Sequence, residues 1–192
     1  HLVPEELEQL ERLSLTDKHM KLQKSLDAFL FCCYAGMRYS DFTNLSKKNI
    51  VDINQETWLI YKSVKTGTEV RLPLYLLFAG KGIVILNKYR NNLEDFFRLR
   101  DNSNINKDLI IIAKLAGLSK KISFHTARHT NATLLIYNGV NITTVQKLLG
   151  HKSVKTTQVY TNIMDMTIVH DLEKIKQAAL GIKKKTDNSF NK

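Results

Sequence analysis

Apolar residues recur at helical spacing in the first third of the chain. Leu22, Leu26 and Phe29 are separated by four and then three residues, so they share one face of a helix. This pattern predicts a long helix over residues 18–34, and Gly36 follows as a residue suited to end it.

Similar patterns, together with their capping residues, predict further helices along the chain. Ser40 is expected to cap a short helix that reaches Leu45. Asn141 or Thr143 is expected to start another, which ends near Gly150. The remaining predicted helices cover residues 4–13, 81–100, 104–116, 126–137, 153–160 and 164–179.

Three short runs rich in β-forming residues interrupt this helical pattern. The first covers residues 50–53, and the runs 58–61 and 70–74 flank a turn at 65–68. The sequence therefore predicts a mainly α fold that carries a small antiparallel β-sheet, an α+β class.

The length of 192 residues, 43% of them hydrophobic, suits one packed domain. We expect that domain over residues 1–180 and a flexible basic and polar tail over 181–192. No apolar run approaches the roughly 18 residues of a membrane span. The acidic start at 4–8 lacks the apolar segment of a signal peptide. Cys32 and Cys33 fit no metal spacing, which predicts reduced core residues of a cytoplasmic protein.

The net charge of +11 is unevenly distributed along the chain. Residues 1–113 hold 16 Lys and Arg against 14 Asp and Glu, whereas residues 114–192 hold 13 against 4. Between Leu109 and Met164 there is no Asp or Glu. Because ordinary solvated surfaces mix both signs, a folded segment without carboxylates favours a polyanion such as nucleic acid as the partner.

Two short motifs carry candidate chemistry inside this acid-free segment. His125 and Arg128 are three residues apart, so they share a face of the predicted helix. A guanidinium matches the oxygens of a phosphate, and a histidine transfers protons near neutral pH. His151 follows the helix-ending Gly150, which predicts an exposed corner, and Tyr160 lies nine residues further on. Each motif alone arises often by chance, and an isolated tyrosine is most often a packing residue.

Taken in their order along the chain, these pieces resemble the tyrosine recombinase family, which includes phage and transposon integrases. The resemblance covers about residues 3–174 and implies the catalytic domain of that family. The catalytic residues that it implies are Arg38, Lys65, His125, Arg128, His151 and Tyr160.

Three positions depart from the usual pattern of the family. Ala-Gly-Met precedes Arg38 where Thr-Gly-Leu is common, and Asp41 stands where glutamate is frequent. Sequences that flank the catalytic positions resemble the family as well: Arg128-His129-Thr130, Leu148-Leu149-Gly150-His151 and Thr156-Thr157-x-x-Tyr160.

The chemistry of phosphodiester cleavage gives each of these residues an expected role. Arg38 and Arg128 would stabilise the charge that develops on the non-bridging oxygens, with His151 as a third donor. A tyrosine hydroxyl has an ordinary pKa of about 10, so Tyr160 needs a base, for which His125 is the candidate. Lys65, on a hairpin expected to be mobile, would protonate the leaving 5′-oxygen.

The resemblance further implies a covalent 3′-phosphotyrosine intermediate, which conserves the energy of the broken bond and needs no cofactor. No metal is expected either, since the acid-free segment lacks the carboxylates of a two-metal nuclease. Double-stranded DNA is the implied partner, bound by a homotetramer, and the implied location is the nucleoid of a bacterial cytoplasm. His129, Lys152 and Lys155 are expected to contact DNA phosphates.

The family usually carries a core-binding domain before the catalytic one, and this chain is expected to lack it. The sequence therefore predicts site-specific recombination or integration, with the integrase of a mobile element as the favoured case. Two alternatives stay open: DNA relaxation of the type IB topoisomerase kind, and a DNA-binding module whose catalysis has lapsed.

Overall fold

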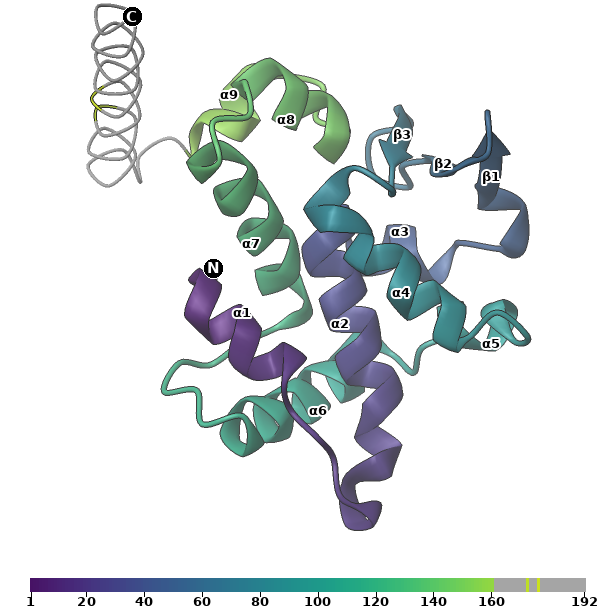
Figure 1. Cartoon of the computed structure of the whole chain (residues 1–192), viewed down its shortest axis with the longest axis vertical. Coiled ribbons are helices and arrows are strands. Elements are labelled where there is room, and N and C mark those ends of the chain that lie inside the picture. Colours follow the sequence, from purple (N-terminus) through teal and green to yellow (C-terminus); the bar gives the residue numbers. More distant parts are fainter. Residues whose placement is uncertain (161–171, 173–175, 177–192) are drawn as a thin grey trace, which may run out of the picture.

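The computed structural model describes residues 1–160, 172 and 176, and shows a helical domain with a small sheet (Figure 1). Its α-helices include α1 (Pro4–Glu11), α2 (Gln23–Ala35), α3 (Tyr39–Thr43), α4 (Lys81–Lys88), α5 (Leu93–Phe97), α6 (Asn102–Leu115), α7 (Phe124–Tyr137), α8 (Ile142–Leu149) and α9 (Val154–Gln158).

Short 3₁₀ helices and three strands complete the described part of the chain. The 3₁₀ helices are η1 (Asp17–Leu22), η2 (Lys47–Asn49) and η3 (Leu77–Gly80). The strands are β1 (Ile50–Ile53), β2 (Glu56–Lys62) and β3 (Glu69–Pro73), which form an antiparallel sheet in the order β1-β2-β3. The predicted mainly α fold with a small antiparallel sheet is therefore confirmed.

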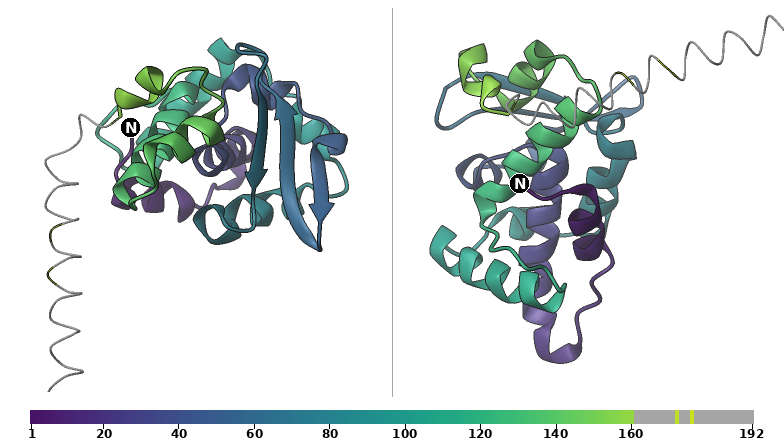
Figure 2. Two further views of the ribbon diagram at one scale, coloured as in Figure 1. Left: turned by 90° about the horizontal axis from the view of Figure 1, so that it is seen from above. Right: turned by 90° about the vertical axis from the view of Figure 1, so that its left-hand side faces the viewer.

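The sheet forms one layer beside the helices (Figure 2). Leu59 on the central strand pairs with Ile50 on one side and Leu72 on the other. Leu59 and Leu72 are fully buried, because alternate residues of these strands face the helices. In Figure 1 the sheet lies at the same end of the molecule as α8 and α9.

Helix α2 forms the centre of the core, and every residue from Ser25 to Ala35 is buried. Its C-terminal half packs against α7, whose Asn131 donates hydrogen bonds of 2.9 Å to the carbonyls of Cys33 and Tyr34. Cys32 and Cys33 are buried free thiols, as the sequence predicted. Near the N-terminus, the amide of Leu2 donates to Thr130 of α7 at 2.9 Å, which attaches the first residues to the same core.

Some predicted boundaries were wrong. The helix expected over 18–34 begins as 3₁₀ turns and becomes α-helical only at Gln23. Ser40 is not the cap of α3, because Arg38 has the extended backbone of an N-cap residue and Tyr39 is already helical. The helix expected over 81–100 is two helices, separated by asparagines that favour turns.

Helix α7 begins earlier than predicted because Ser123 caps it. The backbone amide of Ser123 donates a hydrogen bond to Thr126 Oγ1 at 3.0 Å, and the amide of Phe124 donates to Asn106 of α6 at 2.8 Å. The predicted helix over 164–179 and the tail over 181–192 lie outside the described residues, apart from residues 172 and 176.

Candidate active site

The C-terminal end of α2 sets the base of the site. Gly36 has a φ of +66°, and a Cβ there would lie 2.6 Å from Asn131 Oδ1 and 2.8 Å from Leu149 Cδ2. Only glycine takes this left-handed conformation in so little space. The turn therefore brings α2, α7 and α8 into close contact just before Arg38.

Arg128 on α7 is held between the ends of two helices. Its Nη1 donates to the carbonyl of Gly36 at 2.7 Å, and its Nη2 donates to the carbonyl of Leu149 at 2.6 Å. Both acceptors lie at helix C-termini, where the partial charge is negative and stabilises a cation. Burial and the charge of Arg38 lower the pKa of Arg128 to about 10, so it remains charged near neutral pH.

Arg38 lies at the start of α3 and is less enclosed. Its Nη1 lies 3.5 Å from Asp41 Oδ2 and 3.3 Å from Ser63 Oγ. The Asp41 carboxylate also accepts the backbone amide of Val64 at 2.8 Å. Asp41 therefore connects Arg38 to the end of β2, and its shorter side chain still reaches both partners.

The turn that carries Lys65 is attached to α8 rather than projecting freely. The hydroxyl of Thr66 donates to the carbonyl of Gly150 at 3.1 Å, and Gly67 donates its amide to the carbonyl of Ser63 at 2.8 Å. A Cβ on Gly150, whose φ is +63°, would lie 2.6 Å from Val70 Cγ2. Lys65 itself is exposed, so a fixed loop presents a solvent-facing ammonium group.

His151 is placed by the end of α8. Its amide donates to the carbonyl of Gln146 at 3.0 Å, while Gly150 donates to Lys147 at 3.0 Å, the bond pattern of a Schellman motif. The expectation of an exposed corner was wrong: His151 is only 7% exposed, because the motif turns it inward and Nδ1 lies 2.9 Å from the hydroxyl of Thr157.

A chain of aromatic contacts links His125 to Tyr160. The rings of His125 and His129 lie 4.3 Å apart at 90°, and the rings of His129 and Tyr160 lie 5.3 Å apart at 64°. His125 is exposed, whereas Tyr160 is only 7% exposed. His129 therefore lies beside the tyrosine, and its expected contact with a DNA phosphate stays a prediction.

Electrostatic interactions connect the six predicted catalytic residues. Burial first, and then the charges of Arg128, Arg38 and Lys65, lower the pKa of His151 to about 4. Partial shielding of the His125 ring from water, together with the same three cations, lowers its pKa. Both histidines are therefore neutral near pH 7, which leaves His125 able to accept a proton.

Tyr160 feels two opposing influences. Burial raises the pKa of its hydroxyl, and the charges of Arg128 and Arg38 only partly offset this effect. The phenol is therefore protonated at neutral pH. Arg128 is only 1% exposed, so its guanidinium is almost completely covered by neighbouring groups.

Sequence reasoning missed the residues that support the site. Ser63 is buried between Arg38 and Asp41, and Thr157 is buried against His151. The buried hydroxyl of Tyr61 has no hydrogen-bond partner within the described residues, and the charges of Arg128 and Arg38 act on it. The Thr-Thr flank of Tyr160 was the available signal for Thr157; nothing in the local sequence distinguishes Ser63.

The other predicted DNA contacts are both exposed: Lys152 lies just before α9 and Lys155 lies in its first turn. Among residues 1–160, 172 and 176, no group of three His, Cys, Asp or Glu side chains could hold a metal. Within the same described residues, no helix combines the length and apolar character of a membrane span.

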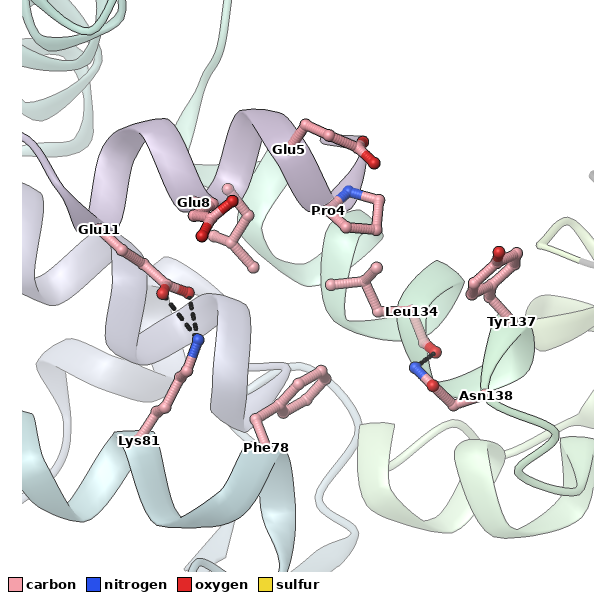
Figure 3. Close-up of a pocket in the computed structure, with 10 residues that line it drawn as sticks. Pro4, Glu5, Glu8, Glu11, Phe78, Lys81, Leu134, Tyr137 and Asn138 are labelled. Atoms are coloured by element: carbon pink, nitrogen blue, oxygen red, sulfur yellow. Dashed lines mark hydrogen bonds and ion pairs between the residues drawn. The ribbon is translucent and has the colours of Figure 1, made fainter.

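A pocket of about 390 Å³ lies elsewhere, between α1, α4 and the end of α7 (Figure 3). Glu11 and Lys81 form an ion pair in it, with nitrogen–oxygen distances of 2.8 and 2.6 Å. Glu5 and Glu8 add further acidic groups to its wall. Because carboxylates repel phosphates, this pocket does not suit a DNA strand.

The described helical domain thus places the charges of Arg38 and Arg128 near the hydroxyl of Tyr160. The family model for the phage integrase family matches residues 2–166. The chain therefore belongs to the phage integrase family.

Two relatives illustrate this membership. A tyrosine recombinase of Pseudothermotoga lettingae is 30% identical over 181 residues, which cover 92% of this chain and 60% of that protein. Tyrosine recombinase XerD of Bifidobacterium longum is 50% identical over 171 residues, which cover 80% of this chain and 54% of that protein. The chain thus spans little more than half the length of these relatives.

Solved structures agree with the fold. The crystal structure of XerA recombinase superposes with a TM-score of 0.70 at 26% identity, covering 91% of this chain and 64% of that one. A lambda integrase dimer bound to a COC′ core site gives a TM-score of 0.60 at 21% identity, covering 81% and 55%. This second likeness concerns the fold alone.

Proposed function

We propose that this chain is the catalytic domain, over residues 1–180, of a recombinase that cuts and rejoins DNA at specific sites through Tyr160. The observation that carries the proposal is that the charges of the predicted catalytic residues act on one another within a single site. The charges of Arg38 and Arg128 act on the Tyr160 hydroxyl, and both act with Lys65 on His125 and His151.

The proposed reaction is a phosphoryl transfer that uses neither a cofactor nor a metal. The Tyr160 oxygen forms a bond to the scissile phosphorus, and the bond from phosphorus to the 5′-oxygen breaks. His125 accepts the phenol proton, and Lys65 supplies a proton to the leaving oxygen. The reverse step, with the 5′-hydroxyl of a partner duplex as nucleophile, completes strand exchange.

The other cationic groups bind the phosphate and stabilise the transition state in this proposal. Arg38 would reach the non-bridging oxygens first, because its side chain is 16% exposed and Arg128 lies deeper. His151 adds a donor, and Arg128 supplies a preorganised positive charge. Lys152 and Lys155 would bind flanking phosphates.

The biological setting that we propose follows the relatives. These relatives are tyrosine recombinases, and structural neighbours at 17–21% identity are integrases or recombinases bound to DNA. We propose that double-stranded DNA is the substrate of this chain and that a homotetramer assembles on it. Action as the integrase of a mobile element, on nucleoid DNA in a bacterial cytoplasm, is part of the same proposal.

Covalent capture tests this function. The chain would be incubated with nicked duplex fragments of genomic DNA, in which loss of the short 5′-hydroxyl strand traps the intermediate. We expect an adduct that survives SDS, with DNA on the peptide that contains Tyr160. Tyr160→Phe should abolish it, whereas Tyr137→Phe, at the far end of α7, should not.

Other outcomes would contradict the proposal in distinct ways. Undiminished capture by Tyr160→Phe would assign the nucleophile elsewhere. Relaxation of plasmids without sequence preference would favour a topoisomerase. Tight DNA binding without an adduct on any fragment would indicate a module that has lost catalysis.

A further inference from the structure

Thr157 contacts both His151 and Tyr160. Its side chain is fully buried, with Oγ1 2.9 Å from His151 Nδ1. Its backbone carbonyl accepts the amide of Tyr160 at 3.1 Å. One residue of α9 therefore connects the histidine side chain to the backbone of the proposed nucleophile.

The backbone of His151 is fixed by a different residue. Gln146 accepts the His151 amide at 3.0 Å, and its side-chain amide donates to the His151 carbonyl at 3.0 Å. With the main chain held at both groups, the freedom that remains is rotation and tautomerism of the imidazole. The hydrogen bond to Thr157 restricts the rotation of the ring and favours one of its tautomers.

The neutral state of His151 makes the tautomer important. A neutral imidazole carries its proton on one nitrogen only, and the partner of the other nitrogen decides which one. If Thr157 donates its hydroxyl hydrogen to Nδ1, the ring proton resides on Nε2. Nε2 then becomes a donor for a phosphate oxygen, because the other nitrogen is occupied inside the protein.

A hydroxyl suits this position better than a carboxylate. A carboxylate at 2.9 Å would stabilise the imidazolium form and add a negative charge near the substrate phosphate. A hydroxyl carries no charge and both donates and accepts. If a bound phosphate drives protonation of His151, Nδ1–H can donate to the same Thr157 oxygen once the hydroxyl hydrogen has rotated away from the ring.

We propose that Thr157 is a positioning residue that holds His151 in the Nε2–H tautomer, aimed at the phosphate, and aligns it with Tyr160. This inference rests on the proposed function for its link to catalysis. The tautomer itself is a property of the free chain. The two parts are therefore open to separate measurement.

The first experiment is nitrogen NMR of the imidazoles near pH 7, with His151→Gln to assign the signals. We expect a dominant Nε2–H tautomer for His151 in the wild type and in Thr157→Ser. Thr157→Val keeps the shape but removes the hydroxyl, so a mixture of tautomers is expected. Thr156→Val, at an exposed neighbouring position, should leave the spectrum unchanged.

The second experiment is a double-mutant cycle on the rate of covalent capture. Thr157→Val should slow capture roughly tenfold, about the loss of one hydrogen bond, and Thr157→Ser should largely restore it. In a His151→Ala background, Thr157→Val should add little, because it acts through the absent ring.

Contrary results would separate the possibilities. A dominant Nδ1–H signal in the wild type would overturn the tautomer assignment. So would a tautomer ratio in folded Thr157→Val that equals the wild-type ratio. Full additivity with His151→Ala would overturn the catalytic role and leave packing as the function of Thr157. A normal tautomer pattern without capture by any variant would count against the proposed function alone.

Discussion

The hydroxyl of Thr66 donates to the carbonyl of Gly150 at 3.1 Å, which joins the β2–β3 turn to the end of α8. The two residues are 84 positions apart in the sequence. Lys65 precedes one of them and His151 follows the other. Lys65, the proposed general acid, and His151, the proposed hydrogen-bond donor to the phosphate, therefore lie next to the two residues that this hydrogen bond joins.

Gly150 should be intolerant of any side chain. In Gly150→Ala the new Cβ would lie 2.6 Å from Val70 Cγ2 and would keep an unfavourable positive φ. We expect a loss of about 2 kcal/mol or more in the free energy of unfolding, measured by urea denaturation. Gly117→Ala is the matched control, because its φ is +76° and no atom lies within 4 Å.

That control separates backbone strain from steric overlap. Gly117→Ala should lose about 1 kcal/mol from the backbone conformation alone. Val70→Ala in the Gly150→Ala background should recover part of the excess loss, because it removes the overlapping methyl group. Equal losses in the two glycine variants would contradict the predicted clash.

Arg128→Lys should destabilise the domain as well as impair capture. A lysine cannot donate to the carbonyls of Gly36 and Leu149 with the geometry of a guanidinium. Loss of one bond to a charged donor predicts about 1.5–3 kcal/mol of destabilisation by urea denaturation. Arg38→Lys, at a more exposed position, should slow capture with a smaller loss of stability. Equal stability of the two variants would contradict this reading.

His151 should titrate near pH 4 rather than near its usual value of 6.5. Because the folded-state pKa lies below the unfolded one, its contribution to stability is fully present above pH 6.5. That contribution is lost as the pH falls through 6.5 toward 4, since the unfolded chain then binds the extra proton. The free energy of unfolding, measured across this pH window, should depend less steeply on pH in His151→Gln than in the wild type. An equal pH dependence would contradict the lowered pKa of His151.

His125→Ala and His129→Ala should impair capture differently. If His125 is the base, its removal should slow capture by a factor on the order of 100 and flatten the acidic limb of the pH profile. His129, whose ring contacts Tyr160, should act mainly on the position of the phenol. His129→Phe should therefore retain more capture than His129→Ala. The reverse order, with His129→Phe as inactive as a base-deficient variant, would assign the proton transfer to His129.

Sequence patterns predicted the helical core and the sheet well, because apolar spacing is a local signal. They placed the start of α3 two residues late, since the extended backbone of Arg38 depends on contacts with Asp41 and Ser63 rather than on capping preference. Sequence also could not anticipate the burial of His151. That burial comes from α9 folding back so that Thr157 reaches the ring.

The candidate site itself was predicted through resemblance, and the structure adds the supporting contacts. The order of the six positions along the chain indicated which residues should meet. The acceptors of Arg128 are backbone carbonyls, which carry no sequence signature. The same is true of the bond between Thr66 and the carbonyl of Gly150.

The placement of Arg128 between two helix ends has a consequence for how such domains diverge. Because this arginine also joins α2 to α8, selection for a folded domain alone would retain it even if the proposed DNA cleavage were lost. Lys65 faces solvent and does not hold two helices together, so selection for folding alone would not retain it. In related chains, the presence of this exposed lysine is therefore better evidence of retained activity than the presence of the buried arginine.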